Sequence, residues 1–388
     1  MVRARSFLAT YLTLAIAGSA AYAMSTMFSA MKPILLTRFV EQVGFGSALA
    51  GLTVAMPFVG IASASLIMRG WLLRTRYWVV VALFGCLLTL AEAVSAVLYA
   101  SKPLILSAQF LGGISVGVLM GTTSRYIATT KTPEKLFGFV DMTAVFLMSF
   151  MVFGIGQAVE AAGLYGGFGL ATLLAGAFTL CMLFFRGDPT DRHGGREVPP
   201  RIIVSARPIA VVAMGVLFVT SSGFGFAFMF TMARDLGMSY ERAGTQIGIL
   251  LFLSAFACQL GGWASAKYGH RRPLAGAFVV CAIGWFVAIN TSHPTIFLAA
   301  LVPAVFSLQF NFPILLALAG SLDRHGQWAA IATPLLVSGF AWAAIVAGVI
   351  VDRWSVQALA IATAAGMAIC LILLQFTRAR AVSEAQTA

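Results

Sequence analysis

Two carboxylates in this sequence lie where an ionised group is costly. Of the 13 acidic residues, only Glu92 and Asp141 fall well inside long apolar stretches. An ionisable side chain near the centre of a lipid bilayer costs at least about 2.5–3.5 kcal/mol unless it is paired or hydrated. Carboxyl groups held in such places can bind and release protons, so both are candidate proton carriers. The alternative is a neutral or ion-paired structural carboxylate near a helix end.

A polar face runs along the first apolar stretch. Its residues recur at intervals of three, four and three positions, which places them on one side of a helix: Tyr22, Ser25, Ser29 and Lys32. If the helix ends near Met31, the long side chain of Lys32 reaches the membrane surface. If the helix continues towards Val40, Lys32 stays among the other polar residues. The sequence leaves both alternatives open.

Amides and aromatic rings gather in two later stretches. Gln309 and Asn311 precede Pro313 within an apolar run, and Phe224 and Phe228 follow a pair of serines in another. Unpaired amides are costly in lipid, and a proline frees a backbone carbonyl that can face a cavity. These four side chains are candidates for contact with a bound molecule. The alternative is that the amides join neighbouring helices and the rings partly face lipid.

The sequence predicts no cofactor, no metal and no enzymatic activity. The five cysteines lie in apolar stretches without paired spacing, and the four histidines fall in or beside loops. Met24, Met27 and Met31 form a stripe that could bind copper(I), but no cysteine or histidine shares their face. We interpret them as a pliable apolar lining.

The elements that position these residues are membrane helices. Hydrophobic residues make up 60% of the chain and charged residues 10%, against about 45–50% and about 25% in soluble proteins. Twelve spans are predicted, near 8–31, 45–68, 77–100, 103–124, 136–159, 164–185, 208–232, 243–265, 274–291, 295–321, 328–351 and 355–375. The basic residues that give the net charge of +12 lie between the spans rather than on one face. We therefore expect a lipid bilayer and no nucleic acid as partner.

The distribution of basic residues predicts the orientation. With the N-terminus inside, all but six of the 25 basic residues lie on the cytoplasmic side; the six are Lys32, Arg38, Lys102, Arg234, Arg242 and Arg353. Both termini are therefore expected in the cytoplasm, in a bacterial inner membrane. The first span runs past the signal-like Ala21-Tyr22-Ala23, so we expect it to be retained as a helix rather than cleaved.

The chain reads as two similar halves. Two segments with glycines at the same spacing, Gly44 to Gly51 and Gly237 to Gly244, are offset by 193 residues (237 − 44 and 244 − 51). Such duplication within an apolar chain is typical of transporters built from two bundles. We predict an N-terminal bundle over 1–185, a linker over 186–207 with Pro199-Pro200, a C-terminal bundle over 208–375 and a tail over 376–388.

Two motifs resemble those of the major facilitator superfamily. The segment GWASAKYGHRRPL, from Gly262 to Leu274, resembles the family loop G-x-L-A-D-R-x-G-R-R, with Ala266 at the aspartate position. The segment QFLGGISVG, from Gln109 to Gly117, is similar to R-F-L-x-G-x-G-x-G, with glutamine in place of arginine. The resemblance implies a gating loop formed by Gly262, Lys267, Gly269, Arg271 and Arg272. The G-P-x-x-G-G motif of many exporters is matched only loosely at Gly154 to Ala161.

The resemblance implies an all-α membrane protein whose twelve transmembrane helices form two pseudo-symmetric six-helix bundles. It also implies a secondary transporter that moves a small organic solute by alternating access. From the two carboxylates we expect proton coupling through Asp141 and Glu92, and we expect the chain to be a monomer. The polar face of the first span and Gln109 then become candidate solute contacts, and Lys32 could hold an anionic or carbonyl group. One alternative is efflux of amphipathic compounds by proton antiport. Another is a receptor or assembly factor that transports nothing.

Overall fold

The computed structural model describes residues 2–45, 47–68, 75–185, 205–238, 240–323 and 325–377, which are almost entirely helical. The helices are α1 (Val2–Val43), α2 (Ser47–Ile67), α4 (Tyr77–Leu98), α5 (Lys102–Ala128), α6 (Pro133–Leu183), α7 (Ala206–Asp235), α8 (Tyr240–Tyr268), α9 (Arg271–Asn290), α10 (Pro294–Gly320), α11 (Gln327–Arg353) and α12 (Ala358–Phe376). Within α6 the backbone leaves the helical region at Ala162 and Gly163. The eleven helices therefore make twelve helical segments in the described chain, and the predicted fold class is confirmed.

The segments are membrane helices. Ten of the described segments are long and apolar enough to cross a bilayer, and α2 contributes a shorter apolar stretch, Ala55–Ile67. Many large apolar side chains are exposed on the outside of the helices, such as Leu66, Leu173 and Ile361. Lipid is the environment in which such a surface is stable. The chain is a multi-pass membrane protein.

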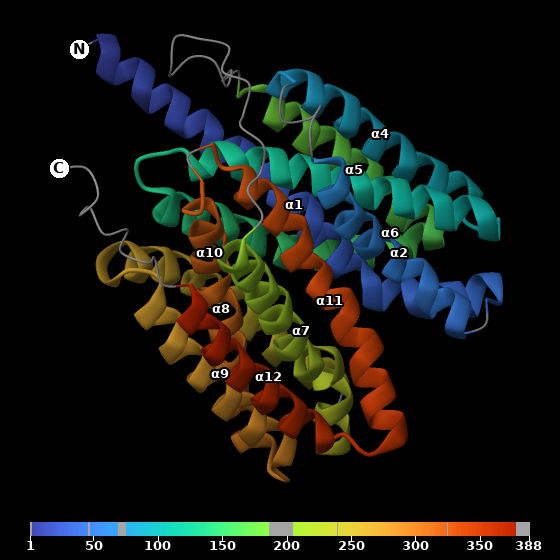
Figure 1. The fold of residues 1–388 in the computed structure, drawn as a ribbon. Helices are drawn as coiled ribbons and strands as arrows, with labels where there is room; N and C mark the ends of the chain where they lie inside the picture. The colour runs from blue at the N-terminus through green and yellow to red at the C-terminus, as the bar shows by residue number, and fades with distance from the viewer. Residues whose placement is uncertain are drawn as a thin grey trace.

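The two halves lie side by side (Figure 1). Helices α1 to α6 form one bundle and α7 to α12 the other. The start of α1, the end of α12 and the turns at 129–132, 269–270 and 321–323 lie at one end, here called the terminal face. The turns at 99–101, 162–163 and 291–293 lie at the opposite face. Most of the predicted linker and tail falls outside the described residues.

The duplicated glycines end equivalent helices. Gly44 follows α1 and Gly237 follows α7, with φ of 70° and 77°, a conformation that side chains disfavour. After each glycine the chain bonds back to the helix, from the Phe45 N–H to the Phe39 carbonyl and from the Met238 N–H to the Ala233 carbonyl, both 3.1 Å. Helix α1 thus ends at Val43, as the repeat predicts, and not near Met31.

Small residues allow α5 to pack closely in the centre. A methyl group at Gly113 would collide with the Pro57 carbonyl of α2, and one at Gly117 would meet Ala64 and Ile61. One at Gly121 would strike the Ala330 carbonyl of α11. These three glycines therefore form a packing surface that joins α5 to both α2 and α11.

Candidate functional site

The first candidate carboxylate, Glu92, is buried within the N-terminal bundle. Its side chain is 0% exposed on α4. Gln109 of α5 donates from Nε2 to Glu92 Oε1 at 3.4 Å and to Ser95 Oγ at 2.9 Å. The second carboxyl oxygen, Oε2, has no partner among the described residues. Glu92 is therefore held by a neutral amide, with no cation among its described contacts, and one oxygen stays available for a proton.

The second carboxylate, Asp141, lies where the two bundles meet. Its side chain is 5% exposed on α6. The Cys258 thiol of α8 lies beside the Asp141 carboxyl, within reach as a hydrogen-bond donor. Oxygen Oδ2 has no partner among the described residues. Asp141 therefore resembles Glu92 in its burial, but the thiol beside it belongs to the other half of the molecule.

Tyr22 connects the same region to a further helix of the second bundle. Its hydroxyl lies 2.8 Å from Ser124 Oγ of α5 and within hydrogen-bonding reach of Thr333 of α11. The Asp141 carboxyl is close enough to act on the Tyr22 hydroxyl electrostatically. Tyr22, Ser124, Asp141, Cys258 and Thr333 thus form one polar cluster between the bundles. The cluster includes residues from three helices of one half and two of the other.

Helices α6 and α8 pack in antiparallel register around Asp141, and we call this contact the α6–α8 seam. It consists of Gly138, Asp141, Val145 and Phe146 of α6 and of Gly262, Cys258, Ala255 and Phe252 of α8. A Cβ at Gly138 would come within 2.8 Å of the Cys258 carbonyl, and one at Gly262 would collide with the Glu134 carbonyl. The rings of Phe146 and Phe252 are 5.0 Å apart. The glycines thus allow the two backbones to approach each other, and the two rings pack together at the end of the seam that points away from the terminal face.

The seam ends at the terminal face with a histidine and a carboxylate. His270 Nε2 lies 3.6 Å from Glu134 Oε1, in the first turn of α6. Burial lowers the pKa of His270, the Glu134 carboxylate opposes this shift, and Arg207 adds to it. A neutral His270 is therefore favoured while the halves are together.

The five predicted gating residues lie around this end of the seam. Gly262 packs on Glu134, and Gly269 has φ of +73° between α8 and α9. Lys267 lies 4.9 Å from the Trp263 ring centre, and the neighbouring Arg272 is exposed. Arg271 donates from Nη2 to Gln375 Oε1 of α12 at 3.0 Å. The contact across the halves is therefore made by Gly262 and by His270, which the sequence analysis did not single out.

A second contact at the terminal face joins α5 to the turn before α11. Arg125 Nε donates to the His325 carbonyl at 3.0 Å, and a methyl group at Gly326 would come within 2.5 Å of the Arg125 carbonyl. Asp323 accepts the backbone N–H groups of His325, Gln327 and Trp328, each at 3.0 Å, and so fixes the turn. The halves are thus in contact on both sides of the terminal face.

The family model described as "Major Facilitator Superfamily" matches residues 14–333, which is most of the chain. The chain belongs to the Major Facilitator Superfamily. It is therefore a member of a transporter family and shares that family's fold. No curated protein matches the sequence.

Solved structures of this superfamily share the fold over nearly the full length. The proton:xylose symporter XylE has a TM-score of 0.70 at 15% identity, with 96% of each chain covered. FucP in the outward conformation has a TM-score of 0.72 at 13% identity, covering 95% of this chain and 100% of FucP. The human organic anion transporter MFSD10 has a TM-score of 0.71 at 14% identity, covering 95% and 99%. At such low identity these likenesses show the fold alone.

The predicted solute-contact residues of this superfamily member have different surroundings. Ser25, Phe224 and Asn311 are buried, whereas Ser29, Phe228 and Gln309 are half-buried. Asn311 is 0% exposed, and neither its Oδ1 nor its Nδ2 has a partner among the described residues. Lys32 lies within α1, but its side chain is outside the described residues. Gln109 bonds to Glu92 instead of facing the other bundle.

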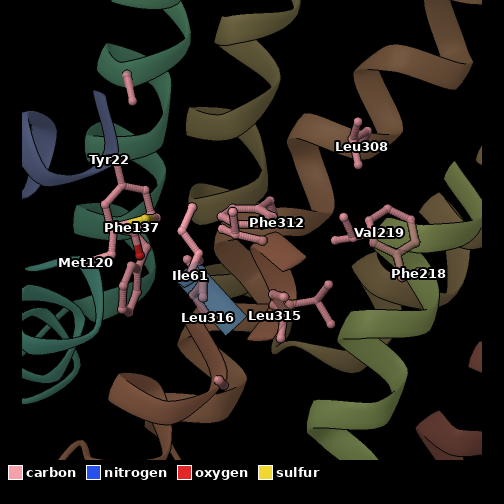
Figure 2. Close-up of a cluster of buried hydrophobic side chains, with 14 of the residues drawn as sticks. Tyr22, Ile61, Met120, Phe137, Phe218, Val219, Leu308, Phe312, Leu315 and Leu316 are labelled. Carbon is pink, nitrogen blue, oxygen red and sulfur yellow. The ribbon is translucent and has the colours of Figure 1, made fainter. Parts of the chain in front are cut away.

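The core of this transporter fold separates the polar cluster from α7. Figure 2 shows Tyr22 and Phe137 on one side and Phe218 and Val219 on the other, with Phe312 of α10 between them. Met27 and Met31 pack in a cluster of the first bundle that includes Phe168 of α6. The methionine stripe is thus part of the bundle core, and these contacts do not favour the interpretation of a pliable lining for amphipathic compounds.

Several residues of the site have no distinct signal in the sequence. Cys258, Thr333 and Ser124 are small side chains in apolar helices, and nothing in their spacing marks them. Gly138 does carry a signal, because it lies about one helical turn from Asp141. A search for glycines near the intramembrane carboxylates points to the α6 side of the α6–α8 contact.

Proposed function

We propose that this protein is a proton-coupled secondary transporter for a small organic solute. The observation that carries the proposal is the pair of buried carboxyl groups in one bundle, Glu92 and Asp141, each with one oxygen unpartnered among the described residues. Structural carboxylates are usually paired with cations, whereas groups that exchange protons need a free oxygen. The transport mechanism is alternating access, in which the two bundles rock about a central site.

The terminal face is cytoplasmic in this proposal, and the membrane is a bacterial inner membrane. The excess of basic residues in the loops of this face supports the orientation. The halves touch here through the α6–α8 seam and through Arg125 and His325. The described conformation is therefore closed to the cytoplasm and corresponds to an outward-facing state.

The solute is proposed to bind between the bundles, near Ser25 and Ser29 of α1 and Gln309 and Asn311 of α10. Asn311 supports this location, because a buried amide with no partner among the described residues is costly unless it receives one. Hydroxyl and amide groups suit a solute rich in hydroxyl or carbonyl groups. Lys32 would add a preference for anions, and Lys32→Ala tests it: unchanged affinity for an anion excludes that preference.

A thermal-stability screen of the purified protein identifies the solute class. The panel consists of monosaccharides, small organic anions and amphipathic cations, and a ligand raises the unfolding temperature by binding the native state. We expect a hydroxyl- or carbonyl-rich compound to do so. A shift only with amphipathic cations would favour the efflux alternative, and the absence of any shift would favour a receptor or assembly factor.

Proton coupling is then tested with that solute in proteoliposomes under an imposed pH gradient. Asp141→Asn and Glu92→Gln are each expected to abolish gradient-driven accumulation. Glu160→Gln is the control, because Glu160 is exposed on the same helix, just before the break at Ala162 and Gly163. If both Asp141→Asn and Glu92→Gln accumulate the solute as the native chain does, proton coupling through these residues is excluded.

A further inference from the structure

The α6–α8 seam contains one carboxyl group in otherwise apolar or glycine-lined surroundings. Asp141 is flanked by Gly138 towards the terminal face and by Val145 towards the opposite face. Cys258 lies against it, and the next contact of α8 is Ala255. Val145, Ala255 and Cys258 are fully or almost fully buried. While the halves are together, the described contacts offer Asp141 a thiol as its only hydrogen-bond donor.

This environment distinguishes strongly between the two protonation states of Asp141. An ionised carboxylate in an apolar contact needs several strong donors or a cation, and a thiol is a weak donor. A neutral carboxylic acid loses far less on burial, because at most one hydrogen bond is missing. The unpartnered Oδ2 is where the proton of the neutral acid would reside. The closed seam therefore favours the neutral acid, and the open seam favours the carboxylate in water.

We propose that Asp141 makes the α6–α8 seam a proton-gated seal of the terminal face. When the seam opens, the Asp141 O–H bond breaks and its proton passes to water at that face. The seam closes again once a proton has rebound to the carboxylate, and the thiol of Cys258 then meets the neutral acid. This inference rests on the proposed function for its role in transport, but the gating itself does not require a solute.

The titratable groups that face Asp141 in the described residues are few. They are Tyr22 of α1 and Cys258 of α8. No interaction of Asp141 with a charged group of α4, α5 or α10 is found in the described part of the chain. A tyrosine hydroxyl ordinarily ionises only near about pH 10, so Tyr22 stays neutral near pH 7. Within the interior of the seam, Asp141 is therefore the group whose charge changes with pH, while His270 and Glu134 lie at its terminal end.

Cys258 provides a direct measurement of seam opening. In the purified full-length chain, the other four cysteines are replaced by serine or alanine, and His270→Gln removes the titrating histidine at the end of the seam. N-ethylmaleimide then alkylates Cys258 only when α6 and α8 separate. The thiolate reacts, so its rate rises with pH regardless of structure. Dividing the rate in unfolded protein by the native rate at each pH removes this effect and gives a protection factor.

We expect the protection factor of Cys258 to fall as the pH rises, by up to about tenfold per pH unit, the limit for one titrating proton. In Asp141→Asn the factor stays high and independent of pH. The matched control is Ser65→Cys in a chain with Cys258→Ala, which places a single thiol at the equivalent position of α2. Its protection is expected to be independent of pH. Glu92→Gln is expected to keep the full pH dependence of Cys258.

Three results would overturn the proposal. These are a protection factor of Cys258 that does not change with pH, a pH dependence that persists in Asp141→Asn, and one that vanishes in Glu92→Gln. Solute accumulation measured in the same variants separates a failure of the seal from a failure of the proposed transport function. If protection depends on pH but transport is not coupled to protons, the seal is supported and the proposed function is contradicted. If transport is coupled but protection does not depend on pH, only the seal is contradicted.

Discussion

The α6–α8 seam and its counterpart, the contact of α2 with α11, occupy equivalent places in the two-fold arrangement but differ in chemistry. By the offset of 193 residues, Asp141 corresponds to Pro334 (141 + 193) and Cys258 to Ser65 (258 − 193). Ser65 donates to the Ala62 carbonyl of its own helix at 2.8 Å, and proline has no side chain that titrates. Duplication thus gives two similar contacts, of which one has acquired a carboxyl group and can respond to protons.

The terminal ends of the two contacts differ in the same way. His270 corresponds to Tyr77 (270 − 193). The Tyr77 hydroxyl lies 3.2 Å from Thr123 Oγ1. Its ring packs on Tyr126 and Phe185, whose ring centres are 5.3 and 4.9 Å away. All three partners belong to the same half as Tyr77. His270 instead approaches Glu134 of the other half. The terminal end of the α6–α8 seam is thus formed by a titratable pair from both halves, whereas the corresponding tyrosine bonds within its own half.

The largest effect is expected from a bulky residue inside the α6–α8 seam. Gly262→Val drives a branched side chain into the Glu134 carbonyl and should shift the balance towards the open seam roughly 5- to 150-fold, since overpacking costs about 1–3 kcal/mol. Alkylation of Cys258 measures the shift. Gly248→Val is the control, because a Cβ there has no neighbour within 4 Å. Equal alkylation rates in the two variants would show that the seam does not close as described.

Tyrosine hydroxyls allow a contact between halves to be compared with one inside a half. Tyr22→Phe removes the bond to Ser124 and the contact with Thr333, and should weaken the closed state by about 0.5–1.5 kcal/mol. Tyr77→Phe removes a similar hydroxyl bonded to Thr123 within the first bundle. Both variants should lower the unfolding temperature. Only Tyr22→Phe should speed alkylation of Cys258; the same acceleration in Tyr77→Phe would contradict the assignment.

His270 should make the terminal end of the seam sensitive to acid. Its pKa is lowered in the closed state, chiefly by burial, so the neutral form stabilises closure above the ordinary histidine pKa of about 6.5. This stabilisation is lost as the pH falls below that value. The effect should be small because the contact is partly exposed. In the Asp141→Asn variant, the alkylation rate of Cys258, divided by the rate in unfolded protein at the same pH, should rise as the pH falls. Adding His270→Gln should abolish that rise. His293→Gln, at the opposite face, should not.

The smallest effect is expected at the α2–α11 contact. Ser65→Ala removes a hydroxyl that bonds only within its own helix among the described residues, so stability should change by at most about 0.5 kcal/mol. Transport and Cys258 alkylation should match the native chain. A marked change in the pH dependence of transport would mean that this contact also takes part in gating, and the contrast between the two seams would fail.

The sequence predicts the fold well because lipid imposes strong rules. Twelve apolar stretches, the break near Gly163 and the glycines that end α1 and α7 are all visible in the residue pattern. Glu92 and Asp141 stand out for a similar reason, since charge is rare where water is absent. The length of α1 beyond Met31 was predictable only through the repeat, because Lys32 and Arg38 interrupt the apolar run.

The partners of these carboxylates could not be predicted in the same way. A membrane helix is apolar on most sides, so its sequence does not tell which face meets a neighbour. Gln109 illustrates this limit, because a motif at the right place suggested a solute contact whereas the side chain bonds to Glu92 and Ser95. Cys258 meets Asp141 from a distant part of the chain, and only the packing of α6 on α8 brings them together.

Recording proton and solute movement at the same time tests the coupling role of Asp141 most directly. Proteoliposomes loaded with a pH-sensitive dye receive the solute found in the stability screen, with no pH gradient imposed. We predict that the native chain and Glu160→Gln move protons together with the solute, and that Asp141→Asn moves the solute down its own gradient without protons. Proton movement by Asp141→Asn equal to that of the native chain would contradict the assignment of the coupling proton to Asp141.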